Sequence, residues 1–189
     1  MQEHATRTTT PTTPATPLWR GLEYGPAAVV LVPRPVRGLS DLPESWQSLA
    51  QRFQVAWCVV PDGVESLHRV EDVVETLADR NSHTQVVAHA SLADVAARVV
   101  AEFGETVQGL ILVGAGELPE PGGVRVRRVV DVEEPDLADE FVVAAIERAL
   151  RTGVRAGRVS VGLPAARLSG AVGGAPLRVR HSASPAGLG

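Results

Sequence analysis

The chain has 189 residues, of which 44% are hydrophobic and 21% are charged, and these values predict a single soluble globular domain with tails. The formal net charge of −4 argues against nucleic acid as the main partner, because a phosphate-binding surface needs concentrated positive charge. The single cysteine, Cys58, excludes an internal disulfide and a cysteine-cluster metal site, and the apolar stretches are too short to span a bilayer.

Both ends of the chain are expected to lie outside the folded domain. Residues 1–17 are rich in Thr and Pro and predict a disordered tail. This tail has no hydrophobic core segment, so we expect no secretory signal and a cytoplasmic protein. Residues 162–189 are rich in Gly and Ala and predict a weakly structured segment, which leaves residues 18–161 as the domain.

Between the tails, apolar runs of strand length alternate with stripes of helical spacing. The predicted strands are residues 27–32, 55–60, 85–88, 110–113 and 124–132. The predicted helices are residues 43–53, 70–77, 92–103 and 135–150. Solidly apolar strands separated by amphipathic helices predict a mainly parallel sheet, buried on both faces, in a three-layer αβα sandwich of the α/β class. Ligands of such sheets bind beyond the carboxyl ends of the strands.

The order and spacing of these pieces resemble the α/β-hydrolase fold family. The resemblance is carried by AAVVLVPRPVRG, SWQSLAQRFQVAWCVVPDG, VEDVVETLADR and QVVAHASLADVAARVVAEFGETVQGLILVGA. These segments span residues 27–115, the front half of that fold. The resemblance implies a small α/β-hydrolase-like domain, truncated and without a clear cap domain.

The strained turn that presents the nucleophile in this family, G-x-S-x-G, is altered here. The motif falls on Ala88, His89, Ala90, Ser91 and Leu92, so both glycines and the serine are missing. Ala90 has no oxygen with which to attack a carbonyl. The resemblance therefore implies a degenerate active site.

Ser91, next to the vacant nucleophile position, has two interpretations. It is a displaced nucleophile if the turn has slipped by one residue, although His89 would then occupy a glycine position. It is otherwise the N-cap of the following helix, with Asp94 three residues later, because a serine oxygen satisfies an orphan backbone N–H there. We favour the cap. For His89 we likewise favour a structural role over that of a catalytic base.

The loop after the first strand departs from the family as well. The family usually has His-Gly there, where the backbone helps to hold an oxyanion, and this chain has Pro33-Arg34. Proline has no N–H, and losing one such donor costs about 3 to 4 kcal/mol of transition-state stabilisation. The donor from Ser91 is expected to persist. Arg34 and Arg37 would lie at the mouth of the pocket and could bind a small acyl or anionic ligand, unless they are ordinary surface arginines.

Three functions remain open from the sequence. The leading hypothesis is a non-hydrolytic ligand-binding, regulatory or partner protein, with a protein partner or a homo-oligomer contact at an open sheet edge. The second is an active esterase- or thioesterase-like serine hydrolase that uses Ser91, His181 and an acid near Asp131. The third is a lyase or cyclase that uses His89 as a base in the same pocket. We expect no cofactor and no metal, since the acidic run at 133–136 has no companion histidine.

Overall fold

The computed structural model describes residues 16–34, 40–80, 83–117, 119 and 123–159, with side chains up to Thr152. The strands are β1 (Leu18–Gly21), β2 (Ala27–Val32), β3 (Gln54–Val59), β4 (Thr84–His89), β5 (Val107–Val113) and β6 (Arg125–Val129). The helices are α1 (Gln47–Ala50), α2 (Leu67–Asp79), α3 (Ala93–Glu102) and α4 (Glu140–Val159), and the 3-10 helices are η1 (Glu44–Trp46), η2 (Gly63–Ser66) and η3 (Ala90–Leu92). Both predicted tails lie almost wholly outside these residues.

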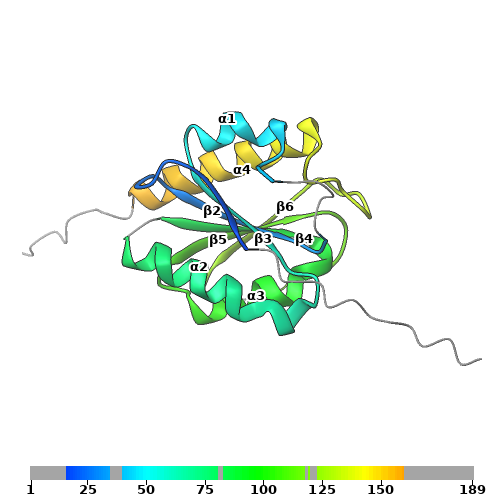
Figure 1. The fold of residues 1–189 in the computed structure, drawn as a ribbon, viewed down its shortest axis with the longest axis horizontal. Helices are drawn as coiled ribbons and strands as arrows, with labels where there is room; N and C mark the ends of the chain where they lie inside the picture. The colour runs from blue at the N-terminus through cyan, green and yellow to red at the C-terminus, as the bar shows by residue number, and fades with distance from the viewer. Residues whose placement is uncertain (1–15, 35–39, 81–82, 118, 120–122, 160–189) are drawn as a thin grey trace, which may run out of the picture.

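The six strands form one sheet in the order β1-β3-β2-β4-β5-β6. Every pairing is parallel except that of β1, which runs antiparallel to β3. Helices α1 and α4 cover one side of the sheet and α2 and α3 cover the other (Figure 1). The predicted three-layer αβα sandwich with a mainly parallel sheet is therefore confirmed.

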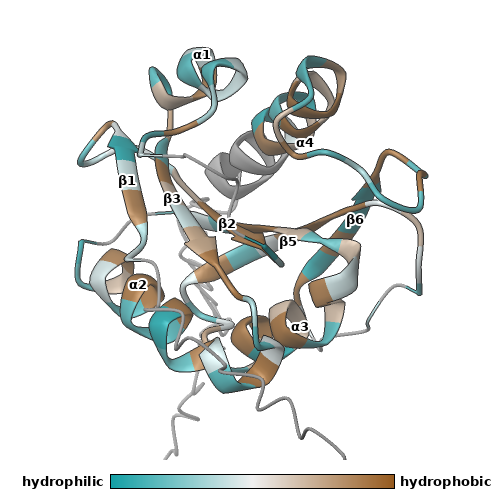
Figure 2. Ribbon diagram, turned by 45° about the vertical axis from the view of Figure 1, so that its right-hand side comes forward, coloured by the Kyte–Doolittle hydropathy of each residue, from teal (hydrophilic) through white to brown (hydrophobic). Residues whose placement is uncertain are grey.

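The core consists of two layers, one on each side of the sheet. Alternate residues of each strand point to opposite sides, so Val29 and Leu31 pack toward α2 and α3 while Val30 and Val32 pack toward α1 and α4. Figure 2 shows the central strands and the inner helix faces as apolar. Cys58 lies in the first layer, and burial raises the pKa of its thiol to about 12, which keeps it protonated and unreactive.

The structure corrects three sequence predictions. Strand β1 was not predicted, because four residues are too few to show a period. The helix predicted over 43–53 is reduced to η1 and α1. The last helix begins at Glu140 and not at Pro135, because the Asp139 carboxylate accepts the N–H groups of Phe141 (2.8 Å) and Val142 (3.2 Å) and fixes the start there.

Glycine is required where the chain turns out of β1. Gly21 has φ +99°, and a Cβ at this position would collide with the carbonyl oxygens of Ala50 and Phe53. This close approach brings the end of β1 against the end of α1.

Among the helices that the structure describes, none is long and apolar enough to cross a membrane.

Candidate functional site

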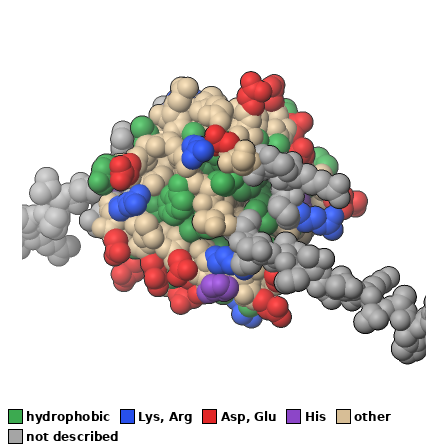
Figure 3. Space-filling model, in the orientation of Figure 1, with side chains coloured by type: hydrophobic (Ala, Val, Ile, Leu, Met, Phe, Trp, Pro, Cys, Tyr) green, Lys and Arg blue, Asp and Glu red, His purple; other side chains and the backbone are tan. Residues whose placement is uncertain are grey.

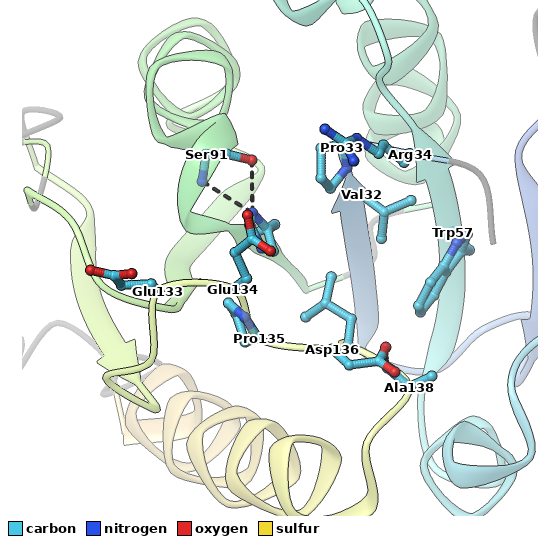
Figure 4. A pocket seen from close by; sticks show the side chains of 12 residues that line it. Val32, Pro33, Arg34, Trp57, Ser91, Glu133, Glu134, Pro135, Asp136 and Ala138 are labelled. Carbon is cyan, nitrogen blue, oxygen red and sulfur yellow. Dashed lines mark hydrogen bonds between the residues drawn. The ribbon is translucent and has the colours of Figure 1, made fainter.

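A cavity of about 460 Å³ opens at the carboxyl edge of the sheet, where the fold class predicts a ligand site. The ends of β2 and β4 and the loop after β6 surround it, and Trp57 of β3 forms part of its wall (Figure 4). Its lining residues are Val32, Pro33, Arg34, Trp57, His89, Ser91, Glu133, Glu134, Pro135, Asp136, Leu137 and Ala138. The lining thus holds three carboxylates and one guanidinium, which gives the cavity a negative balance.

The turn after β4 is built around His89, not around Ser91. His89 has extended backbone angles (φ −58°, ψ 139°), and its Nδ1 accepts the backbone N–H of Ser91 at 3.1 Å. The imidazole therefore caps η3, and α3 begins at Ala93. The prediction that Ser91 is the N-cap is wrong, because Ser91 lies inside η3. His89 thus has a structural role as a cap, and whether it also acts as a base stays open.

Ser91 and His89 also make a side-chain contact. The Ser91 Oγ lies 2.7 Å from His89 Nδ1. Because Nδ1 already accepts the Ser91 N–H, the neutral ring carries its proton on Nε2, and the Ser91 hydroxyl donates to Nδ1. The backbone N–H of Ser91 was expected to remain available to an oxyanion. It is instead engaged by the cap.

Two opposing effects act on the imidazole. Burial lowers the pKa of His89, and the nearby Glu134 carboxylate raises it by a smaller amount, so the net shift is downward. His89 is therefore neutral at physiological pH, which is the state its cap requires. Glu134 is the acid that the structure brings to His89, whereas the sequence pointed to Asp131 first.

The loop that carries the acids is anchored to η1, about ninety residues away in sequence. The Trp46 indole N–H donates to the Leu137 carbonyl oxygen at 2.7 Å, and the Ser45 hydroxyl donates to the Ala138 carbonyl oxygen at 2.7 Å. At the start of the loop, Val130 has φ 62°, a left-handed conformation that is costly for a β-branched residue. The two side-chain anchors thus hold this loop against the cavity and offset the strain at Val130.

The other residues singled out from the sequence lie in different places. Pro33 and Arg34 line the cavity, as the position of their loop predicted. Asp131 does not line it and forms an ion pair with Arg128 at 3.7 Å. Arg37 and His181 lie outside the described residues. The structure therefore brings Ser91 together with His89, and the proposed grouping of Ser91, His181 and Asp131 stays a prediction.

A histidine cap predicts a pH-dependent stability. Since the pKa of His89 lies below 6.5 in the folded state, the unfolded chain binds this proton first as the pH falls. The stabilisation from a neutral His89 is complete above about pH 6.5 and decreases below it. His89→Asn retains a capping oxygen but does not titrate in this range. We expect the variant to lose less stability than the wild type as the pH falls below about 6.5.

The measurement is the free energy of unfolding by urea between about pH 7.5 and about pH 5, for the wild type and the variant. The difference between the two proteins should become smaller toward acid pH. Parallel pH profiles would contradict the prediction.

Over the described part of the chain, no group of three or more His, Cys, Asp or Glu side chains could hold a metal ion.

Comparisons with known proteins assign the chain to no family. No family model matches it, and no curated protein matches it. Among solved structures it is similar to N-formylmaleamic acid deformylase from Pseudomonas putida S16, with 22% identity, a TM-score of 0.34 and coverage of 56% of this chain and 46% of that one. It is also similar to an esterase from a marine microorganism, with 18% identity, a TM-score of 0.31 and coverage of 55% and 44%. The chain thus spans less than half the length of either structure.

Proposed function

We propose that the protein is a non-hydrolytic ligand-binding protein whose cavity at the carboxyl edge takes a small cationic molecule. The observation that carries this proposal is the lining of the cavity, where Glu133, Glu134 and Asp136 outnumber Arg34. A cavity of about 460 Å³ fits a small organic ligand. Carboxylates on its wall attract an ammonium or guanidinium group and repel an anion.

Three features support the absence of hydrolysis. The nucleophile position is Ala90, Pro33 has no N–H to offer an oxyanion, and the Ser91 N–H is engaged by His89. Each missing oxyanion donor costs about 3 to 4 kcal/mol of transition-state stabilisation. The cavity therefore retains space for a ligand, and its described lining residues do not supply the two backbone donors that would stabilise a tetrahedral intermediate.

The positions of the acidic side chains in the loop at residues 133–136 support a cation as the occupant. The Asp136 Oδ1 accepts the Ala138 N–H at 2.8 Å and so has a fixed position. Glu134 is exposed and near enough to His89 to raise the pKa of the imidazole, and the edge of the nearly buried Trp57 lines the cavity. Aromatic walls with nearby carboxylates are a chemistry that recognises organic cations.

The test is a calorimetric titration of the full chain with methylguanidinium, choline and putrescine, and with acetate, butyrate and phosphate as matched anions. We expect at least one cation to bind and the anions not to bind. Glu134→Gln should weaken the binding of that cation about tenfold, because the variant removes one charge from the cavity. Glu105→Gln is the control, since Glu105 is exposed in the turn between α3 and β5, at the amino edge of the sheet, and should leave the affinity unchanged.

Binding of the anions alone would contradict the proposal. It would instead assign the cavity to the small acyl or anionic ligand expected from Arg34 and Arg37. Equal loss of affinity in Glu134→Gln and Glu105→Gln would show that the cation binds outside the cavity.

A serine hydrolase is the second candidate, and one contact favours it. The 2.7 Å distance between Ser91 Oγ and His89 Nδ1 lies within the range of a nucleophile and its general base, and the Glu134 carboxylate is near enough to raise the pKa of that histidine. Labelling by a fluorophosphonate probe separates the candidates. Labelling of the wild type that disappears in Ser91→Ala would establish the hydrolase, and no labelling of the folded protein is the result expected of the binding protein.

A further inference from the structure

A second surface of the molecule lies at the β6 edge of the sheet, away from the cavity. β6 is the terminal strand in the sheet order and pairs with β5 alone among the described strands. An edge strand presents unpaired backbone N–H and C=O groups along its outer side. Beside it, α4 completes a groove of about 630 Å³. Its lining residues are Arg127, Arg128, Val129, Val130, Phe141, Ala145, Arg148, Ala149 and Thr152.

The groove is positively charged, although the protein as a whole is negative. Its lining contains three arginines and no carboxylate, and Arg125 extends the positive charge along β6. Arg127 donates to the Ala149 carbonyl oxygen at 3.2 Å, so its guanidinium is held against α4, and Arg148 stands exposed one turn of α4 away from Thr152. One acid is close by, since Asp131 pairs with Arg128 at 3.7 Å. Other exposed acids lie on the far side of the sheet, for instance Asp72, Glu75 and Asp79 of α2, the region where acidic groups gather in Figure 3.

An exposed aromatic side chain lies at one end of the same groove. Phe141, in the first turn of α4, is 75% exposed. A large aromatic ring in solvent beside a charged groove is a recurrent anchor of protein–protein contacts. Open backbone groups, guanidiniums and an aromatic ring therefore occur together on one surface.

We propose that the β6 edge and its groove bind an extended acidic segment of a partner protein as an added strand. The backbone of the segment would pair with the outer side of β6, its carboxylates would meet Arg127 and Arg148, and an apolar residue would cover Phe141. Pairing along a strand of five residues buries a small area, so the complex is transient.

Charge argues against the other occupants. A second copy that paired through β6 would place arginines opposite arginines, which is destabilising. The chain's own residues 160–189 contain three arginines and no acid, and residues 1–15 contain a single acid, Glu3, with one arginine. A nucleic acid has no backbone amides to pair with a strand, and the net charge of −4 repels it.

The test uses fluorescence anisotropy of a fluorescein-labelled peptide of alternating valine and glutamate, added to the full chain. We expect this peptide to bind and its counterpart with lysine in place of glutamate not to bind. A version with alternate backbone nitrogens methylated should lose binding, because it cannot form the strand pairing. Arg148→Glu should weaken binding at least tenfold. Arg98→Glu, on an exposed arginine of α3 across the sheet, should not change it.

Three results of the peptide titrations would overturn the proposal. They are no binding of the glutamate peptide, equal binding of its methylated version, and displacement of the peptide by an oligothymidylate at lower concentration than by unlabelled peptide. The last result would assign the groove to nucleic acid. Self-association of the free chain that Arg148→Glu abolishes would assign it to a second copy. Arg148 and Arg98 do not line the cavity at the carboxyl edge, and peptide anisotropy does not report on that cavity. Failure of this proposal would therefore leave the ligand proposal unaffected.

Discussion

Replacing Trp46 with alanine is expected to lower the free energy of unfolding by about 3 to 5 kcal/mol. Trp46 is fully buried, and its ring meets that of Trp57 edge to face at a centroid distance of 5.3 Å. The variant would leave a cavity in the layer of core beside α4 and would leave the Leu137 carbonyl oxygen without its indole donor. The measurement is a urea unfolding curve monitored by far-ultraviolet circular dichroism.

Two further variants separate packing from anchoring. Trp46→Phe retains most of the buried ring and loses the donor to Leu137, so it should cost less than the alanine variant and still weaken ligand binding in the cavity. Tyr24→Ala is the control, because Tyr24 is 82% exposed and its removal should change the stability by less than about 0.5 kcal/mol. A Trp46→Ala protein as stable as Tyr24→Ala would refute the core position of this tryptophan.

Gly21→Ala is the second substitution with a large expected effect, about 3 to 4 kcal/mol of destabilisation. The residue combines φ +99° with the carbonyl oxygens of Ala50 and Phe53 at the place where a Cβ would stand. Backbone atoms cannot rotate aside as a side chain can. The variant must therefore displace β1 or α1, and thermal or urea unfolding would report the loss.

Gly63 provides a matched comparison for Gly21. It also has a positive φ, +56°, but a Cβ there would meet no atom of the described residues within 4 Å. Gly63→Ala should therefore cost only the strain of a left-handed residue, about 1 kcal/mol. Equal effects of the two substitutions would show that conformation alone, and not the close approach of the backbone, selects glycine at position 21.

The strands of the sheet could be predicted from sequence because they are buried on both faces. A strand such as AAVVLV at 27–32 has no polar residue, and the observed β2 has the predicted bounds. The start of the last helix could not be predicted in the same way. Pro135 and its acidic neighbours looked like a first turn, yet the decisive group is the Asp139 carboxylate, whose contact with two backbone N–H groups depends on the path of the preceding loop.

The site could be predicted to the level of its loops and not of its contacts. The fold class placed Pro33, Arg34 and Ser91 at the carboxyl edge, and all three line the cavity. The negative balance of the cavity was missed, since the acids at 133–136 were read as helix-terminal charges. Their position depends on Trp46 and Ser45, two residues about ninety positions earlier, and no local pattern in the sequence reveals such an anchor.

The order of strands in the sheet has a kinetic consequence. Neighbours in the sheet are joined by helices or long connections, and none of the pairings described is a β-hairpin, so folding cannot begin with a local pair of strands. The central strand β2 gains its two neighbours only when β3 and β4, both later in the chain, have been made. During synthesis the six apolar residues of β2 therefore remain unpaired until β4 has been made. In this interval their exposed apolar side chains and backbone groups favour aggregation of the nascent chain.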